Sequence, residues 1–226
     1  MRQICLINGS PKSNEGASYN ILNYILRKLE TTYDQKNIIH AYQLLNSPNS
    51  NKEDLFIQIL SSHIIVVVFP LYVDCLPSHL LEMLANLHTY KQNYKISSNE
   101  PCYFYGVVNC GFLEGEHNIH ALKILEHYAT QAGFKWHGGL GLGGCGSGMP
   151  ELAKGNLPQS SPIGHALYTL IDSLLHIKAL PNKDSIILAS YPYPKWLFIL
   201  ACDLFWIMGA KKNKVTYRIL FKKPYL

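Results

Sequence analysis

The sequence lacks several patterns that define common kinds of functional site. Its 6 cysteines include no C-x-x-C pair, so a zinc or iron–sulfur site is not expected and reduced thiols are. No G-x-x-x-x-G-K-[ST] motif occurs, which argues against ATP or GTP hydrolysis. His117 and His120 form an H-x-x-H pair without a suitably spaced third ligand. No metal site is therefore predicted.

Charge is also scarce, and its distribution is uneven. Only 15% of the 226 residues are charged, and the formal net charge is +5. Six basic residues and no acidic one occur from Lys211 onward. No helix-turn-helix, zinc-finger or aromatic-interleaved RNA motif accompanies this basic tail, so a nucleic-acid partner is not expected. Residues 1–8 lack the apolar core of a secretory signal, and we expect a cytoplasmic protein.

Short apolar stretches alternate with segments of helical periodicity along most of the chain. We predict strands at residues 2–8, 38–44, 63–69, 102–108 and 134–140, and helices at 17–29, 54–60, 77–87, 119–132 and 163–175. This alternation predicts a parallel sheet covered by helices on both faces. Because such crossovers are right-handed, the simplest arrangement is a doubly wound α/β sandwich with ligands at the carboxyl ends of its strands.

The loop over residues 8–18 carries the strongest signal for a ligand. It joins an apolar strand to an amphipathic helix and is rich in glycine, serine and asparagine. Hydroxyls, an amide, a lysine and the first N–H groups of the helix can converge there on phosphate oxygens. The candidate residues are Ser10, Lys12, Ser13, Asn14, Ala17 and Ser18. The alternative is that the serines and asparagine only cap the helix.

Gly9-Ser10-Pro11-Lys12, with Asn14 and Ser18 downstream, resembles the NADPH-dependent FMN reductase family and related flavodoxin-like oxidoreductases. The stretch Pro70-Leu71-Tyr72-Val73-Asp74 strengthens the resemblance, which covers residues 2–146. It implies a flavodoxin-like sheet of five strands in the order 2-1-3-4-5. It also implies FMN as the cofactor, with its ring between two further loops. The residues implied there are Pro70, Leu71, Tyr72, Val73 and Asp74 after the third strand, and Asn109, Cys110 and Gly111 after the fourth.

The resemblance implies an NAD(P)H-dependent oxidoreductase that works as a homodimer. NAD(P)H, a transient co-substrate, would pass hydride to bound FMN and on to a quinone, a flavin or a similar acceptor, without a catalytic side chain. The G-x-G-x-x-G matches within residues 138–148 are interpreted as a flexible loop at the rim of the flavin pocket. Cys110 has no apparent resolving cysteine nearby in sequence, which disfavours a redox thiol.

Two alternatives to an enzyme stay open. One is a non-enzymatic electron carrier of the flavodoxin type, and the other is a flavodoxin-like domain that binds another phosphate ligand. Flavodoxin carriers are typically strongly acidic, whereas this chain is net positive, so the enzyme is favoured.

The C-terminal part, expected to separate as residues 191–226 from a domain of residues 1–190, is apolar and then basic. Residues 196–208 are apolar on nearly all faces, except for Asp203, and Lys211, Lys212 and Lys214 follow. The run is shorter than the roughly 20 residues of a spanning helix. We expect this segment to pack against the domain or a partner subunit, with an interfacial membrane helix as the alternative.

Overall fold

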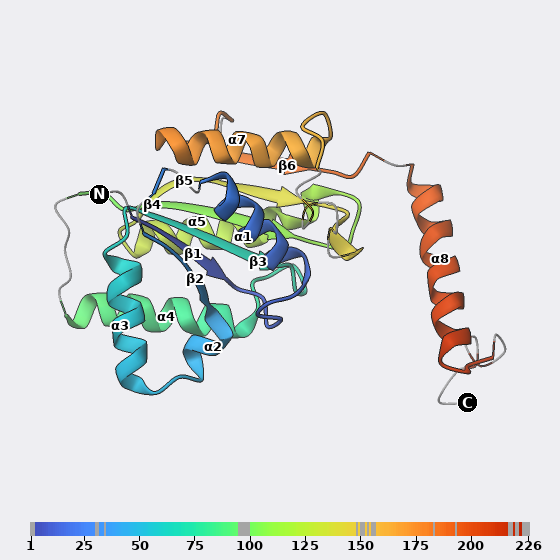
Figure 1. Cartoon of the computed structure of the whole chain (residues 1–226), viewed down its shortest axis with the longest axis horizontal. Helices are drawn as coiled ribbons and strands as arrows, with labels where there is room; N and C mark the ends of the chain where they lie inside the picture. The colour runs from blue at the N-terminus through green and yellow to red at the C-terminus, as the bar shows by residue number, and fades with distance from the viewer. Residues whose placement is uncertain are drawn as a thin grey trace. The chain divides into compact units, whose positions relative to one another are not determined.

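The computed structural model (Figure 1) describes residues 3–29, 32–33, 35–94, 100–147, 149, 152, 154, 157–182, 184–192, 194–216, 219 and 222. The chain divides into two compact units, Met1–Tyr191 and Pro192–Leu226. The first unit contains the sheet and the second a single long helix, and each is described by itself.

A six-stranded parallel sheet forms the centre of the first unit, in the order β2-β1-β3-β4-β5-β6. Its strands are β1 (Gln3–Asn8), β2 (Gln35–His40), β3 (Ile64–Pro70), β4 (Tyr103–Asn109), β5 (Lys135–Leu142) and β6 (Ile186–Ala189). The helices are α1 (Gly16–Lys28), α2 (Ala41–Leu45), α3 (Asn49–Leu60), α4 (Ser78–Asn93), α5 (Ile119–Gln131) and α7 (Pro162–His176), with short 3₁₀ turns η1 (Gly115–Asn118) and η2 (Cys145–Ser147).

Helices cover both faces of this sheet, as Figure 1 shows. Successive residues of the central strand β3 alternate between two cores: Ile64, Val66 and Val68 pack with α1 and α7, whereas Ile65, Val67 and Phe69 pack with α3, α4 and α5. All six of these side chains are fully buried. This two-sided burial explains why β3 is a continuous apolar run rather than an alternating one.

The prediction of a five-stranded sheet was wrong by one strand, although the order 2-1-3-4-5 is present. β6 joins the edge beside β5, with Gly139 paired to Ile186 and Leu142 to Ala189. It has only four residues, too few to show a pattern. The predicted strand over residues 38–44 ends early as well, because α2 begins at Ala41 and buries Ala41 and Leu44 with helical spacing.

The first half of the glycine-rich stretch that was interpreted as a loop, residues 138–142, is strand, because β5 continues to Leu142, and residues 145–147 form η2. A Cβ on Gly139 would come within 2.6 Å of the Leu122 side chain, and one on Gly141 within 2.7 Å of Leu188. Gly139 therefore allows α5 to approach the sheet closely, and Gly141 leaves room for a side chain of the neighbouring strand β6. They do not form a dinucleotide-binding turn.

The second unit consists mainly of α8 (Lys195–Lys212), which begins directly after Pro194. Proline suits this position because a helix start needs no N–H donor there. None of the residues of α8 is buried. Among the described residues, no helix is both long enough and apolar enough to cross a membrane.

Candidate functional site

A cavity of about 410 Å³ opens at the carboxyl ends of β1, β3 and β4. Its walls are Ser10, Lys12, Gly16, Ala17, Ser18, Pro70, Leu71, Tyr72, Asn109, Cys110, Gly111, Cys145 and Gly146. Three loops that are far apart in sequence therefore meet at one place. Ten of the fourteen residues predicted from sequence line the cavity, whereas Ser13, Asn14, Val73 and Asp74 do not.

Two serine hydroxyls at the first loop are oriented by neighbours that donate to them. The Ser10 Oγ accepts from the backbone N–H of Lys12 at 3.2 Å, and the Ser18 Oγ accepts from Asn109 Nδ2 at 2.8 Å. Both serines are buried to within a few per cent. Because their oxygens already accept a hydrogen bond, each hydroxyl hydrogen is left to donate into the cavity, as an anion requires.

The N-terminus of α1 lines the cavity together with these two serines and Lys12. We call this part of the cavity the anion-binding corner. Its cap residue, Glu15, makes no side-chain hydrogen bond to the helix, and its first turn contains no acidic residue. The first N–H groups of a helix have no intrahelical partner and carry partial positive charge. Gly16, Ala17 and Ser18 bring that end to the cavity wall, and Lys12 lines the same cavity. The arrangement is suited to a phosphate group.

Asn8 holds this loop in shape, and sequence reasoning did not single it out. Its Oδ1 accepts from the Ser10 N–H at 3.0 Å, an Asx turn. Its Nδ2 donates to the Ser13 carbonyl at 2.6 Å and lies 3.2 Å from His40 Nδ1. Because Nδ2 is only a donor, His40 Nδ1 is the acceptor, and burial lowers the pKa of His40 in keeping with a neutral ring.

Gly9 and His79 fix the first loop against the neighbouring strand and helix. The His79 Nε2–H donates to the Gly9 carbonyl at 2.9 Å, while Gly9 N–H donates to Val68 O at 2.8 Å. A Cβ on Gly9 would come within 2.6 Å of Leu80 and 2.8 Å of Phe69. Glycine is therefore required at position 9 for close packing. Burial lowers the pKa of His79, and its hydrogen bond to the Gly9 carbonyl partly opposes the shift.

The second loop is a two-residue turn between Tyr72 and Cys75. The Tyr72 N–H donates to Cys75 O at 3.0 Å and the Cys75 N–H to Tyr72 O at 3.1 Å. Val73 and Asp74 have φ values of 49° and 58°, which a type I′ turn requires and a β-branched residue such as valine adopts only with strain. Val73 is 98% exposed, whereas Tyr72 is 47% exposed and lines the cavity.

The third loop offers one backbone donor to the cavity. Both hydrogens of Asn109 Nδ2 are used, by Ser18 Oγ and by Phe69 O at 3.0 Å, and the Cys110 N–H donates to Leu142 O at 2.9 Å. The N–H of Gly111 has no partner among the hydrogen bonds of the described residues. Asn109 therefore positions the loop, and Gly111 is the residue that can meet a ligand through its backbone.

Cys110 has a cysteine neighbour that the sequence did not reveal. The Cys145 N–H donates to the Cys110 carbonyl at 2.8 Å. The two residues meet because β4 and β5 are paired and the segments that follow them both turn just beyond the sheet. Burial raises the pKa of Cys110, and it raises that of Cys145 to about 12. The Cys110 Sγ accepts from Asn118 Nδ2 at 3.4 Å. Both sulfurs are thus protonated thiols at neutral pH, which fits a wall rather than a nucleophile.

Comparison with known proteins gives matches in structure only. No family model and no curated protein matches the sequence. The chain is similar in structure to an NADH:FMN oxidoreductase in its apo form, with a TM-score of 0.59 and 16% identity over 87% of this chain and 99% of that one.

Two further solved structures are similar at low sequence identity. An NAD(P)H:quinone oxidoreductase from Methanothermobacter marburgensis gives a TM-score of 0.55 at 12% identity, over 78% of this chain and 98% of that one. An FMN-dependent NADH-azoreductase from Bacillus anthracis, solved with FMN, gives 0.50 at 12% identity over 78% and 99%. Together with the strand order, these likenesses identify the first unit as a flavodoxin-like doubly wound α/β fold.

Proposed function

We propose that the chain binds FMN in the cavity at the carboxyl ends of β1, β3 and β4, and acts as an NAD(P)H-dependent oxidoreductase. The observation that carries the proposal is the pairing, in one cavity, of an anion-binding corner with an open wall that holds an aromatic side chain. Ser10, Lys12 and Ser18 line the first, and Tyr72 and Gly111 belong to the second. The three similar structures, all named as FMN- or NAD(P)H-dependent oxidoreductases, support it.

The donors of the site fit the chemical groups of FMN. The phosphate requires several donors and positive charge, which the serine hydroxyls, the start of α1 and Lys12 supply. The ring requires a flat apolar contact and a donor toward its polar edge, for which Tyr72 and the Gly111 N–H are suited. The cavity volume of about 410 Å³ lies within the range of small-molecule sites.

When FMN is bound, it supplies reversible two-electron transfer between NAD(P)H and an acceptor. The residues of this chain position the cofactor and control its surroundings. The Gly111 N–H would stabilise negative charge at the polar edge of the ring. Tyr72 is half-exposed, so its side of the cavity stays open for a nicotinamide and then a quinone, flavin or similar acceptor to enter in turn.

The charge of the first unit favours an enzyme over an electron carrier. Residues 1–191 contain 13 basic and 14 acidic residues, a formal charge of −1. Electron carriers that dock on basic partners depend on a strongly acidic surface to steer association, and a nearly neutral unit does not provide one. A homodimer in the cytoplasm, without a nucleic-acid partner, completes the proposal.

Turnover by the purified full-length chain tests this proposal. The protein is freed of flavin, reconstituted with FMN, and supplied with NADH or NADPH and a water-soluble quinone, while loss of nicotinamide absorbance is followed. The proposal expects FMN-dependent consumption of NADH or NADPH. Tight FMN binding without turnover for either nucleotide would instead favour the electron carrier. Absence of FMN binding would leave only the fold.

A further inference from the structure

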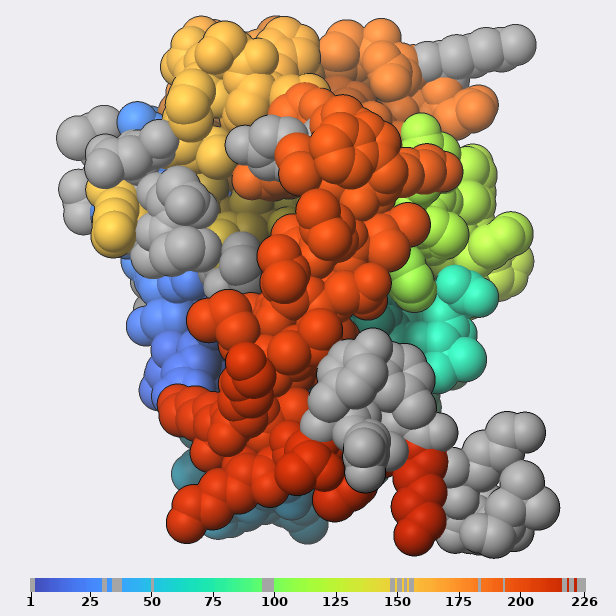
Figure 2. All heavy atoms as spheres, turned by 90° about the vertical axis from the view of Figure 1, so that its right-hand side faces the viewer, coloured from blue at the N-terminus to red at the C-terminus, as the bar shows by residue number. Residues whose placement is uncertain are grey.

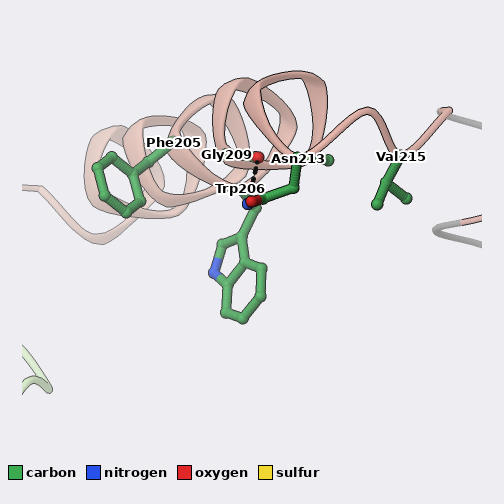
Figure 3. Close-up of a pocket in the computed structure, with 6 residues that line it drawn as sticks. Phe205, Trp206, Gly209, Asn213 and Val215 are labelled. Carbon is green, nitrogen blue, oxygen red and sulfur yellow. Dashed lines mark hydrogen bonds between the residues drawn. The ribbon is translucent and has the colours of Figure 1, made fainter.

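The helix α8 carries a dense set of large apolar side chains that are exposed. Trp196 is 67% exposed, Phe205 77%, Trp206 72% and Met208 68%. Figure 2 shows the atoms of this helix in orange to red, and Figure 3 shows Phe205 and Trp206 projecting outward from its ribbon. Exposed apolar surface on this scale is unfavourable in water and marks an interaction site.

The apolar side chains of α8 surround the helix instead of forming a single stripe. At 100° per residue, Trp196, Leu197, Phe205 and Trp206 project in four directions that are roughly 90° apart around the helix axis, and all are at least 39% exposed. A helix with a single partner shows one apolar stripe. A helix that is apolar all round requires an apolar environment all round.

Charge is confined to the ends of α8, apart from Asp203. Lys195 is its first residue, Lys211 and Lys212 are its last, and Lys214 follows at once. Residues 192–226 contain seven basic residues and one acidic residue. The second unit therefore has a formal charge of +6, which accounts for the positive charge of the whole protein.

These charges favour an anionic lipid surface over a second copy of the helix. Two parallel copies would bring Lys211 and Lys212 beside their equivalents, and two antiparallel copies would bring Lys195 beside Lys211 and Lys212. Either arrangement places like charges together. An anionic bilayer provides apolar chains around the middle of the helix and negative headgroups for its lysines, which reach them with their long side chains.

The C-terminal end of α8 also offers apolar chains a concave surface. A hollow of about 400 Å³ lies between the last turns of the helix and Val215, with Phe205 and Trp206 on its wall (Figure 3). Asn213 closes the helix end, its Nδ2 donating to the Gly209 carbonyl at 2.9 Å. The same carbonyl also accepts from the Asn213 backbone N–H at 3.1 Å, so this group of the last turn is fully paired, as placement near lipid requires.

We infer that α8 is a lipid-binding helix that attaches this protein to the surface of anionic membranes. The helix lies just beneath the headgroups of one leaflet, so that acyl chains surround it, and the lysines at its ends reach the headgroups with their long side chains. Three lysines near the surface, Lys211, Lys212 and Lys214, contribute an affinity gain of roughly 100-fold on anionic over neutral lipid. This inference goes beyond the proposed function and does not rest on it.

Sedimentation of the full-length protein with vesicles tests the inference. Vesicles of phosphatidylcholine alone are compared with vesicles that contain 30% phosphatidylglycerol as a chosen condition, roughly a third of the headgroups being anionic. We expect binding that is roughly 100-fold stronger on the anionic vesicles and that weakens with added salt. A blue shift of tryptophan emission should accompany it, since Trp196 and Trp206 would leave water.

Two variants separate the apolar and the charged contributions. Phe205→Ser with Trp206→Ser should abolish sedimentation with both kinds of vesicle, whereas the triple Lys→Gln variant at 211, 212 and 214 should remove the preference for anionic lipid. Tyr168→Ser is the matched control, because Tyr168 is a half-exposed aromatic residue of α7 and should leave binding unchanged.

Failure of the wild-type protein to sediment with anionic vesicles would overturn the inference, and so would binding that survives Phe205→Ser with Trp206→Ser. A dimer in sedimentation equilibrium that the same double variant dissociates would assign the helix to a second copy instead. FMN binding and turnover with a water-soluble quinone are measured separately on every variant. A failure of membrane binding is thus distinguishable from a failure of the proposed function.

Discussion

Removing the side-chain donors of Ser10 and Lys12 should weaken FMN binding without weakening the binding of riboflavin, which lacks the phosphate. Both side chains line the cavity, and both would be lost in Ser10→Ala with Lys12→Ala. Neither residue belongs to either hydrophobic core, so the fold should persist. The change therefore isolates the anion-binding corner.

The expected loss follows from the burial of the two groups. Ser10 is 6% exposed, and a buried hydrogen bond to a charged group contributes roughly 1.5–3 kcal/mol. Lys12 is exposed, so its charge contributes about 0.2–1 kcal/mol. Together they amount to roughly 2–4 kcal/mol, which corresponds to a 30- to 1000-fold rise in the Kd for FMN.

The assay is quenching of flavin fluorescence, measured separately for FMN and riboflavin with wild-type and double-variant protein. Lys28→Ala is the matched control, because Lys28 lies at the opposite end of α1 and removes the same charge away from the cavity. The reasoning is refuted if FMN affinity is unchanged in the double variant. An equal loss for riboflavin would refute it as well.

Three further substitutions test how Asn8 holds the first loop, how stability depends on the protonation of His137, and how Tyr72 acts on the flavin ring. Asn8→Asp replaces the two Nδ2 hydrogen bonds with repulsion, so FMN affinity should fall about tenfold at pH 8. The new carboxylate should raise the pKa of His40, which burial lowers in the wild-type protein, so that the protonated ring pairs with it and FMN affinity partly recovers at pH 6. Titrations at both pH values check this. Burial, with Lys135 nearby, lowers the pKa of His137 to about 4. The neutral ring therefore contributes up to about 3 kcal/mol to the free energy of unfolding above pH 6.5, and this contribution should be lost as the pH falls from 6.5 to 4. Urea unfolding at a series of pH values should show the loss, and His137→Asn should remove it. Tyr72→Ala should shift the flavin reduction potential, measured by anaerobic redox titration, while the FMN-to-riboflavin affinity ratio stays unchanged.

Local sequence patterns predicted the central sheet because its strands are long and buried on both faces. Residues 64–69 form an uninterrupted apolar run that only a central strand of a covered sheet explains. β6 escaped prediction because it has four residues and is recognisable only by its pairing with β5. The five residues of α2 were mistaken for the end of a strand, since so short a segment shows too little periodicity to decide.

The candidate site was predictable where ligand-facing residues follow one another along a loop, as in the first loop. Asn8 was not, because it is fully buried at the end of β1 and acts through contacts that form only when His40 is brought beside it. The same applies to Cys145, which meets Cys110 through the pairing of β4 with β5. The glycine-rich stretch was mistaken for a flexible loop along its whole length, whereas Gly139 and Gly141 belong to β5 and serve packing.

The most direct test of the central claim is an anaerobic titration of the purified, FMN-reconstituted protein with NADPH and, separately, NADH. Absorbance is followed at the flavin band, and bound FMN is first quantified per chain. We predict one FMN per chain and rapid bleaching by at least one of the two nucleotides. Absence of FMN binding, or bound FMN that neither nucleotide bleaches, would contradict the proposed function.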